Sequence, residues 1–233
     1  MLRLHTEGVP QCSGVVFFQV KFDECGAAMI FSAHEMAPAD VYHTLTQIII
    51  PRPVAWVLSP NDEAGDSLNL APFSFFNAVC SDPPVLMLSI GTKADGTLKD
   101  SCRNLLERKR CVIHIGSEEQ VQAISDTARE LAFGDSELEL TGQELVEFQG
   151  VGMKRLQGAP IAMACSLHQH IEVGNKPQHL LLVEVEQFWI DDAVCYRDDK
   201  GRTRVDADKV RPLARLGGSE YARLGEVFRV VRR

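Results

Sequence analysis

Two long strand-like segments joined by a short turn constrain the fold of this chain more than any other feature. Residues 160–173 and 179–190 are rich in apolar and β-branched side chains, and the Gly-Asn-Lys-Pro sequence at 174–177 favours a turn between them. Neither an all-helical fold nor a parallel sheet with helical crossovers accounts for two such long neighbouring strands. The pair therefore predicts an antiparallel barrel with a few helices.

The second of these segments alternates in the manner of a strand whose two faces meet different surroundings. One face carries Leu180, Leu182, Glu184 and Glu186, and the other carries Leu181, Val183, Val185 and Gln187. Glu184 and Glu186 would share a face and could serve as an acid/base pair, but a solvated face is the favoured interpretation.

Shorter apolar and β-branched runs between turn and proline signals predict the other strands of the barrel. These strands are expected over residues 48–58, 67–71, 85–91 and 110–115. The first begins near Pro51 and Pro53, and residues 61–65 form a hairpin turn that leads into the second.

Helices are expected only between these strands. One covers residues 99–109. Another begins at the capping box of residues 117–120 and is expected to end near Gly134. Residues 135–158 are polar and glycine-rich, and we expect a loop there with a helical turn around 143–148.

The chain shows no internal repeat and no linker between independent units. We therefore expect one domain over residues 39–233, preceded by an N-terminal extension, residues 1–38, of unknown role. The start of the sequence lacks the apolar core of a secretory peptide, and the longest apolar runs are far shorter than a membrane span.

Composition narrows the choice of partners and compartment. With 24 Lys and Arg against 32 Asp and Glu, the net charge is −8, which argues against binding to nucleic acid or to an anionic membrane. The seven cysteines are odd in number and form no C-x-x-C pair, so a reducing, cytoplasmic location is expected.

Several common catalytic signatures are missing from the sequence. It contains no dinucleotide-binding G-x-G-x-x-G at a helix start, no P-loop, no H-E-x-x-H and no G-x-S-x-G. His168 and His170 lie two residues apart on a predicted strand, but no third ligand is identifiable, so we expect no metal site. Ser74 has no His or Asp at a recognisable triad spacing.

The chemically informative residues lie between positions 51 and 104. Arg52 stands between two prolines at the entry of a strand, a costly position for an ordinary surface charge. Residues 69–77 mix aromatic rings with small polar side chains, and Pro72 there leaves neighbouring backbone groups free for the edge of a flat heterocycle. Lys93 and Lys99, with the glycines between Ser89 and a helix start, outline an anion site.

Together these stretches resemble the flavin reductase-like family of FMN-binding split-barrel proteins. The resemblance covers about residues 40–225. It is carried by residues 51–57 (PRPVAWV), 69–77 (NLAPFSFFN), 82–84 (DPP), 99–101 (KDS) with Asn104, and 215–221 (RLGGSEY). The family usually has Thr where this chain has Ser101, and the hydroxyl group is kept.

The resemblance implies a mainly β fold: a six-stranded antiparallel split barrel with flanking helices, usually a homodimer with FMN near the subunit interface. By position in the motifs, three groups of residues would contact the cofactor. Asn69, Leu70, Ala71 and Ser74 would border the isoalloxazine ring or the ribityl chain. Lys99, Ser101 and Asn104 would hold the phosphate, with Ser89, Gly91 and Arg52 nearby.

The resemblance also implies a reaction in which the flavin carries the chemistry. We expect an NAD(P)H-dependent flavin reductase that passes hydride from NADH or NADPH to FMN, with FAD as an alternative flavin and a small molecule as final electron acceptor. A flavin-binding electron carrier or oxidase that does not use nicotinamide remains an alternative. A second is a non-enzymatic split-barrel module that binds another phosphate-bearing ligand or a tetrapyrrole.

Overall fold

The computed structural model describes residues 21–22 and 29–231, which divide between two compact units, residues 1–45 and 46–233. The first unit contains the antiparallel pair β1 (Lys21–Phe22) and β2 (Met29–Ile30). Helix α1 (Pro38–Ile48) begins in the first unit and ends in the second. Most of the expected extension, residues 1–38, lies outside the described residues.

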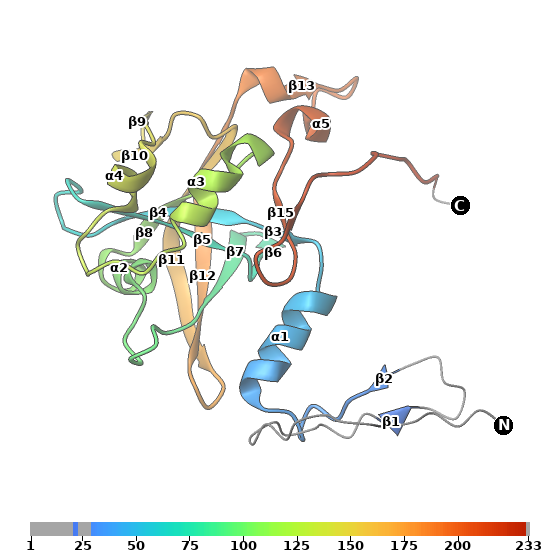
Figure 1. Cartoon of the computed structure of the whole chain (residues 1–233). Helices are drawn as coiled ribbons and strands as arrows, with labels where there is room; N and C mark the ends of the chain where they lie inside the picture. Colours follow the sequence, from blue (N-terminus) through green and yellow to red (C-terminus); the bar gives the residue numbers. More distant parts are fainter. Residues whose placement is uncertain (1–20, 23–28, 232–233) are drawn as a thin grey trace. The chain divides into compact units, whose positions relative to one another are not determined.

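The second unit is built on a seven-stranded antiparallel sheet in the order β5–β4–β8–β11–β12–β7–β6 (Figure 1). Its strands are β4 (Ala55–Pro60), β5 (Leu68–Phe73), β6 (Phe76–Ser81), β7 (Pro84–Ile90), β8 (Arg110–Ile115), β11 (Ile161–Val173) and β12 (Gln178–Ile190). The mainly β antiparallel fold is confirmed, with seven strands in this sheet where six were expected.

The sheet must curl because its two edge strands follow each other in the chain. Only Ser74 and Phe75 separate β5 from β6. In a flat sheet of this order the edges would lie roughly 29 Å apart, whereas the short link spans about 11 Å at most. The carbonyl of Phe75 accepts a hydrogen bond of 2.9 Å from the N–H of Ser89 on β7. The result is a barrel that is split between β5 and β6.

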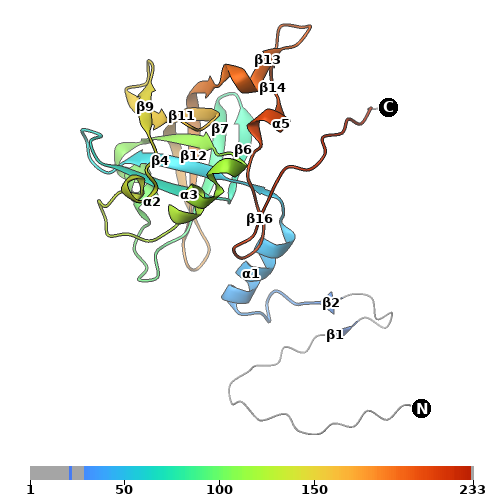
Figure 2. The ribbon, with the colours of Figure 1, turned by 45° about the horizontal axis from the view of Figure 1, so that its top comes forward.

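Apolar residues fill both faces of this curled sheet, so the central strands alternate between two cores. Trp56 and Leu58 of β4 pack outward, against α3 (Val121–Asp126) and the hairpin of β9 (Leu145–Phe148) and β10 (Met153–Leu156). Figure 2 shows the ribbons of β4, α3 and β9. Ala55 and Val57 pack inward, together with Cys102 and Leu105 of α2 (Asp100–Arg108). Helix α2 therefore covers the inner face.

The C-terminal quarter adds small elements around the barrel. A second sheet joins β3 (Arg52–Pro53) to β15 (Ala214–Arg215) and β16 (Tyr221–Ala222). The others are η2 (Asp192–Val194), β13 (Cys195–Arg197), β14 (Thr203–Val205) and α5 (Ala207–Val210). None of the helices in the described part of the chain is long and apolar enough to cross a membrane.

Two expected assignments are wrong. A single strand was expected over residues 48–58. Residue 48 instead ends helix α1, and β3 and β4 follow as two separate strands. The helical turn expected around residues 143–148 is instead the strand β9 (Leu145–Phe148), because positive φ at Gly150 and Gly152 allows a tight hairpin whose apolar face joins the outer core. The preceding helical turn is α4 (Glu137–Thr141).

The helix after Ser117 is also shorter than expected. Its capping box is present at the 3₁₀ turn η1 (Glu118–Gln120), but α3 ends at Asp126, well before Gly134. Thr127 follows directly, and its hydroxyl accepts a hydrogen bond of 2.9 Å from the Trp56 indole. This contact fixes the end of the helix on the barrel.

His114 of β8 is fully buried between the sheet and the β9–β10 hairpin. Its Nδ1 lies 3.0 Å from the Trp56 carbonyl, and its Nε2 accepts a 3.0 Å hydrogen bond from the N–H of Leu156. A carbonyl accepts only, so the neutral ring with its proton on Nδ1 satisfies both partners. Burial, the largest effect, lowers the pKa of His114 to about 4.

This buried imidazole should make stability depend on pH. Between the ordinary histidine pKa of 6.5 and about 4, the unfolded chain binds a proton that the folded chain does not. The free energy of unfolding should therefore fall by about 2 kcal/mol from pH 7.5 to pH 5 through this group alone. Urea unfolding of the wild type and of His114→Gln measures it: the variant should lose less stability by that amount, and equal losses would contradict the prediction.

Candidate functional site

Five of the polar side chains around the predicted site form a buried network between the sheet and α2. Asn69 donates a hydrogen bond of 2.8 Å to the hydroxyl of Ser101. Asn104 donates to Ser59 and Asn61, at 3.1 and 2.8 Å. Ser59 and Asn69 are register partners in β4 and β5, which places both toward α2. These bonds hold α2 against the inner face of the barrel.

The burial of this network changes how its members can act on a ligand. Ser101 and Asn104 are each 1% exposed, and Asn69 is 2% exposed. Their side chains are turned into the protein, and the Asn104 carbonyl oxygen finds no hydrogen-bond partner among the described residues. A phosphate at the start of α2 would meet backbone N–H groups before it met these side chains.

The start of α2 keeps the features of an anion site. Lys99 is its N-cap, in an extended conformation, and the Lys99 side chain makes no capping hydrogen bond. The N–H groups of the first turn, which have no partner within the helix, are thus left uncapped by that residue. Lys99 itself is half-buried, and no ion pair to it is found in the described part of the chain.

Two further cations near this helix start, the predicted Lys93 and also Arg103, already have partners. Lys93 Nζ lies 3.0 and 3.2 Å from the two carboxylate oxygens of Asp100, and 3.4 Å from the carbonyl of Leu131. Arg103 lies over the ring of Phe133, 4.3 Å from its centroid. Lys93 therefore neutralises the acid at the first position of the helix, whereas Lys99 has no such partner among the described residues.

Arg52 occupies the other end of the predicted motif and is 6% exposed. Its guanidinium donates to the carbonyls of Thr46, Ile49 and Leu216, at 2.6, 2.8 and 2.7 Å. Its Nε also donates to the Ser74 hydroxyl at 3.4 Å. Arg52 thus fixes the bend between β5 and β6 to the end of α1 and to the C-terminal segment.

The remaining predicted residues lie on both sides of this bend. Ser89 and Gly91 both lie against the side chain of Gln178 at the start of β12. Ser89 Oγ is 3.5 Å from Gln178 Oε1, and a Cβ added at Gly91 would lie 3.1 Å from Gln178 Nε2. Ala71 is half-buried, as is Ser74. Leu70 differs, because its side chain is fully buried in the outer core, on the opposite face of β5 from Asn69. Only the backbone of Leu70 can border a ligand on the inner side.

Glu137 is a site neighbour that the sequence did not reveal, because it lies in the stretch expected to be a loop. It is 4% exposed, and one of its oxygens accepts a hydrogen bond of 2.9 Å from the N–H of Leu70. Burial is the main cause that raises the pKa of this carboxyl. The first residue of α4 therefore holds the motif strand β5 from outside.

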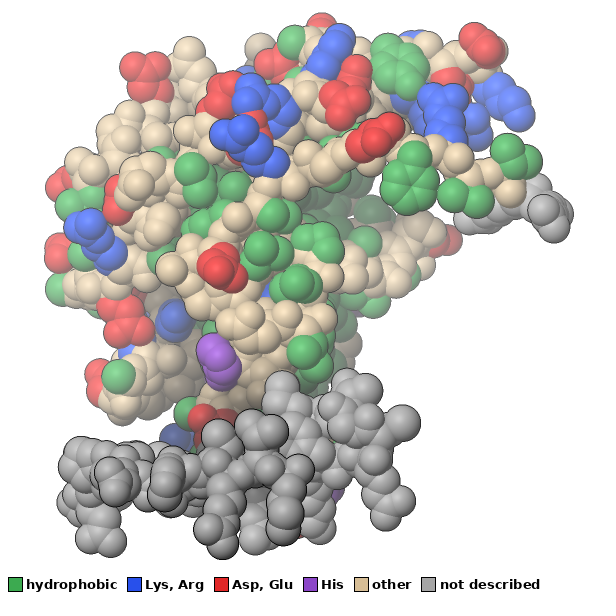
Figure 3. Space-filling model, turned by 45° about the vertical axis from the view of Figure 1, so that its right-hand side comes forward, with side chains coloured by type: hydrophobic (Ala, Val, Ile, Leu, Met, Phe, Trp, Pro, Cys, Tyr) green, Lys and Arg blue, Asp and Glu red, His purple; other side chains and the backbone are tan. Residues whose placement is uncertain are grey.

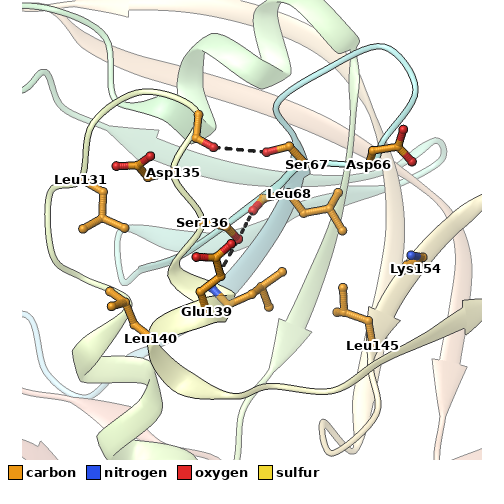
Figure 4. A pocket seen from close by; sticks show the side chains of 12 residues that line it. Asp66, Ser67, Leu68, Leu131, Asp135, Ser136, Glu139, Leu140, Leu145 and Lys154 are labelled. Atoms are coloured by element: carbon orange, nitrogen blue, oxygen red, sulfur yellow. Dashed lines mark hydrogen bonds between the residues drawn. The ribbon is translucent and has the colours of Figure 1, made fainter.

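A pocket of about 620 Å³ lies beside the contact between Glu137 and Leu70 (Figure 4). Apolar side chains such as Leu68 and Leu145 line it together with Asp66, Glu139 and Lys154. Hydrogen bonds from Ser67 to the Gly134 carbonyl and from Ser136 to the Leu68 carbonyl form its rim. None of the residues predicted to contact the cofactor lines this pocket.

A sheet that closes into a split barrel, with an uncapped helix start beside the split, defines the split-barrel class of proteins. Comparison with known proteins is more specific: the model of the flavin reductase like domain matches residues 48–203. The chain belongs to the flavin reductase-like family.

Individual relatives agree with this assignment. YwrF of Bacillus subtilis is 36% identical over 207 residues, which cover 87% of this chain and 98% of that protein. Component B of nitrilotriacetate monooxygenase from Bacillus cereus is 36% identical with a TM-score of 0.79, covering 88% of this chain and 99% of that one. The 2-nitrobenzoate 2-nitroreductase NbaA of Pseudomonas fluorescens is 25% identical with a TM-score of 0.76, covering 88% and 96%.

The clamp made by Arg52 should be sensitive to a change that keeps its charge. Arg52→Lys removes the planar fork and leaves buried carbonyls without donors, so the free energy of unfolding should fall by about 1.5–3 kcal/mol. Urea unfolding measures this loss. Arg103→Lys, at a guanidinium that only lies over Phe133, should cost about 1 kcal/mol or less. Equal losses in the two variants would show that the carbonyl contacts of Arg52 contribute little.

Proposed function

We propose that this chain is a flavin-dependent oxidoreductase that binds FMN between the β5–β6 bend and the start of α2 and is reduced by NADH or NADPH. One observation carries the proposal. The motif strand and the helix start are joined by the hydrogen bond from Asn69 to Ser101, so both parts of the family pattern meet at one place. The membership of the chain in the flavin reductase-like family supports it.

The residues at this place suit a phosphate ester. The first turn of α2 offers N–H groups that its N-cap leaves uncapped, and Lys99 adds a positive charge beside them. The acid that would repel a phosphate there, Asp100, is already paired with Lys93. Lys99 and the backbone of residues 100–102 would then hold the phosphate, and Ser101 and Asn104 would support the helix from behind.

The isoalloxazine ring would lie along the β5–β6 bend. Ala71 and Ser74 there are half-buried, and Asn77 at the start of β6 is exposed, so backbone and small polar groups are accessible to the edge of a ring. When bound, FMN would supply the hydride and electron-transfer chemistry. The chain's own residues bind and orient it, and Arg52 keeps the bend in place.

We also propose that the chain works as a homodimer in the cytoplasm. Large apolar side chains of the second unit are exposed, and Figure 3 shows one face on which such side chains reach the surface. They include Ile48, Ile49, Ile50, Val79, Leu224, Val227 and Phe228. Exposed apolar surface of this kind favours a protein partner. The described cysteines are all free thiols, which suits a reducing compartment.

Loss of the Lys99 charge should weaken cofactor binding. Lys99→Ala should raise the dissociation constant of FMN by about 10- to 150-fold, which corresponds to about 1.5–3 kcal/mol for a hydrogen bond to a charged group. Titration with FMN, followed by flavin fluorescence, measures it. Lys109→Asn is the matched control: it removes one positive charge from the other end of α2, where φ is 62° and Asn is tolerated. Equal weakening by both variants would move the phosphate away from the start of α2.

Nicotinamide use can be tested separately from flavin binding. The FMN-loaded protein, mixed anaerobically with NADH or NADPH, should lose its visible flavin absorbance, and the faster of the two identifies the preferred donor. Repeating the titration with FAD ranks the two flavins. A protein that binds FMN but is bleached only by dithionite would instead be an electron carrier or oxidase independent of nicotinamide.

A further inference from the structure

The β11–β12 hairpin, whose ribbon is labelled in Figure 1, brings three side chains that can ligate a metal together close to its turn. Glu172 on β11 is directly opposite His179 on β12, and His170 lies two residues before Glu172. The Nε2 atom of His170 is 3.0 Å from the Nδ1 atom of His179, with the ring centroids 5.2 Å apart. One ligand atom from each of the three residues lies within 4.8 Å of the others.

A β-bulge decides which histidine belongs to this cluster. The register between β11 and β12 shifts between Leu167 and Gln169, so His168 is the extra residue. His168 therefore does not share a face with His170, as a regular strand would require, and its Nδ1 lies 3.4 Å from the carboxylate of Glu184. His170 faces the same side of the sheet as Leu181, its register partner in the inner core.

The ligand set suits a borderline divalent cation. Two imidazoles and one carboxylate are a common set for Zn²⁺, with a fourth position left for water or a ligand. Two nitrogens bound tetrahedrally to Zn²⁺ lie about 3.3 Å apart, close to the 3.0 Å between His170 and His179. Small side-chain movements therefore suffice to place one ion between the two rings.

One ligand of this cluster is buried in the sheet, and the other two are accessible to solvent. His179 is 5% exposed and lies between β11 and β7, opposite Glu172 on one side and Ile90 on the other. His170 is half-buried and Glu172 is exposed, so an ion can enter from solvent. Cys102 of α2 is not among the residues whose ligand atoms come together here.

We propose that His170, Glu172 and His179 bind one Zn²⁺ ion, or a divalent transition-metal ion of similar preference, at this end of the barrel. The three ligands come from two strands of one hairpin, so the site is local and needs no partner chain. It also does not depend on flavin. The alternative is a histidine pair that only shares a hydrogen bond, and the two interpretations differ in what they predict for Zn²⁺.

Calorimetric titration with ZnCl₂ tests the site on the untagged full-length chain after removal of metals with a chelator. One equivalent should bind, and Co²⁺ should give a visible d–d spectrum. His170→Ala and Glu172→Gln should each weaken Zn²⁺ binding by more than about tenfold, the lower limit for residues that merely support a ligand. His168→Ala, on the same strand but across the bulge, should bind Zn²⁺ like the wild type.

Two outcomes would overturn the proposal. They are a wild type that binds no Zn²⁺ at micromolar concentrations, and a His168→Ala variant that loses binding to the same extent as His170→Ala. Circular dichroism checks that each variant is folded. His179 is buried, so histidine variants at this cluster can fail to fold. In that case the test rests on Glu172→Gln, at an exposed position. The titration is run without FMN, so a failure of flavin binding leaves its result unaffected.

Discussion

The two-residue link between β5 and β6 is the constraint on which the rest of the structure depends. These strands stand at opposite ends of the sheet order, yet Ser74 and Phe75 alone connect them. The sheet can satisfy this only by closing, and closure turns one face inward, where it must be filled by apolar side chains. Arg52 then holds the link itself through the Ser74 hydroxyl and three backbone carbonyls.

Closure also explains why polar motif residues are buried. Asn69 and Ser59 face the barrel interior, where an unpaired amide or hydroxyl would be costly, and the first two turns of α2 provide their partners, Ser101 and Asn104. These hydrogen bonds set the orientation of α2, and hence the direction in which its N–H groups point. In the proposed binding mode, Asn69, Ser101 and Asn104 therefore position the backbone of α2 and do not themselves contact the phosphate.

The sequence predicted the elements whose signals are local. The β11–β12 pair, β7, β8 and α2 follow from apolar runs, a turn and helical spacing, and the motif at residues 69–77 indicated the family. The sequence did not predict the β9–β10 hairpin. Its apolar residues pack in an outer core that is formed mainly by strands far away in the sequence, so no local pattern indicates them. They are Leu145, Phe148, Met153 and Leu156. The sequence also did not reveal that Lys93 is paired with Asp100, because this contact depends on how the loop between them folds back.

Bulges in the long hairpin show why side-chain faces are harder to predict than strands. A regular alternation places His168 with His170 and Glu184 with Glu186, but each strand carries one extra residue, near His168 and at Glu186. Each insertion reverses the faces beyond it, so Gln187 reaches the β9–β10 hairpin, where it donates to the Gln149 carbonyl. The same reversal turns His170 inward to meet His179. The chemistry available at that end of the barrel thus depends on one inserted residue, which no periodicity in the sequence reveals.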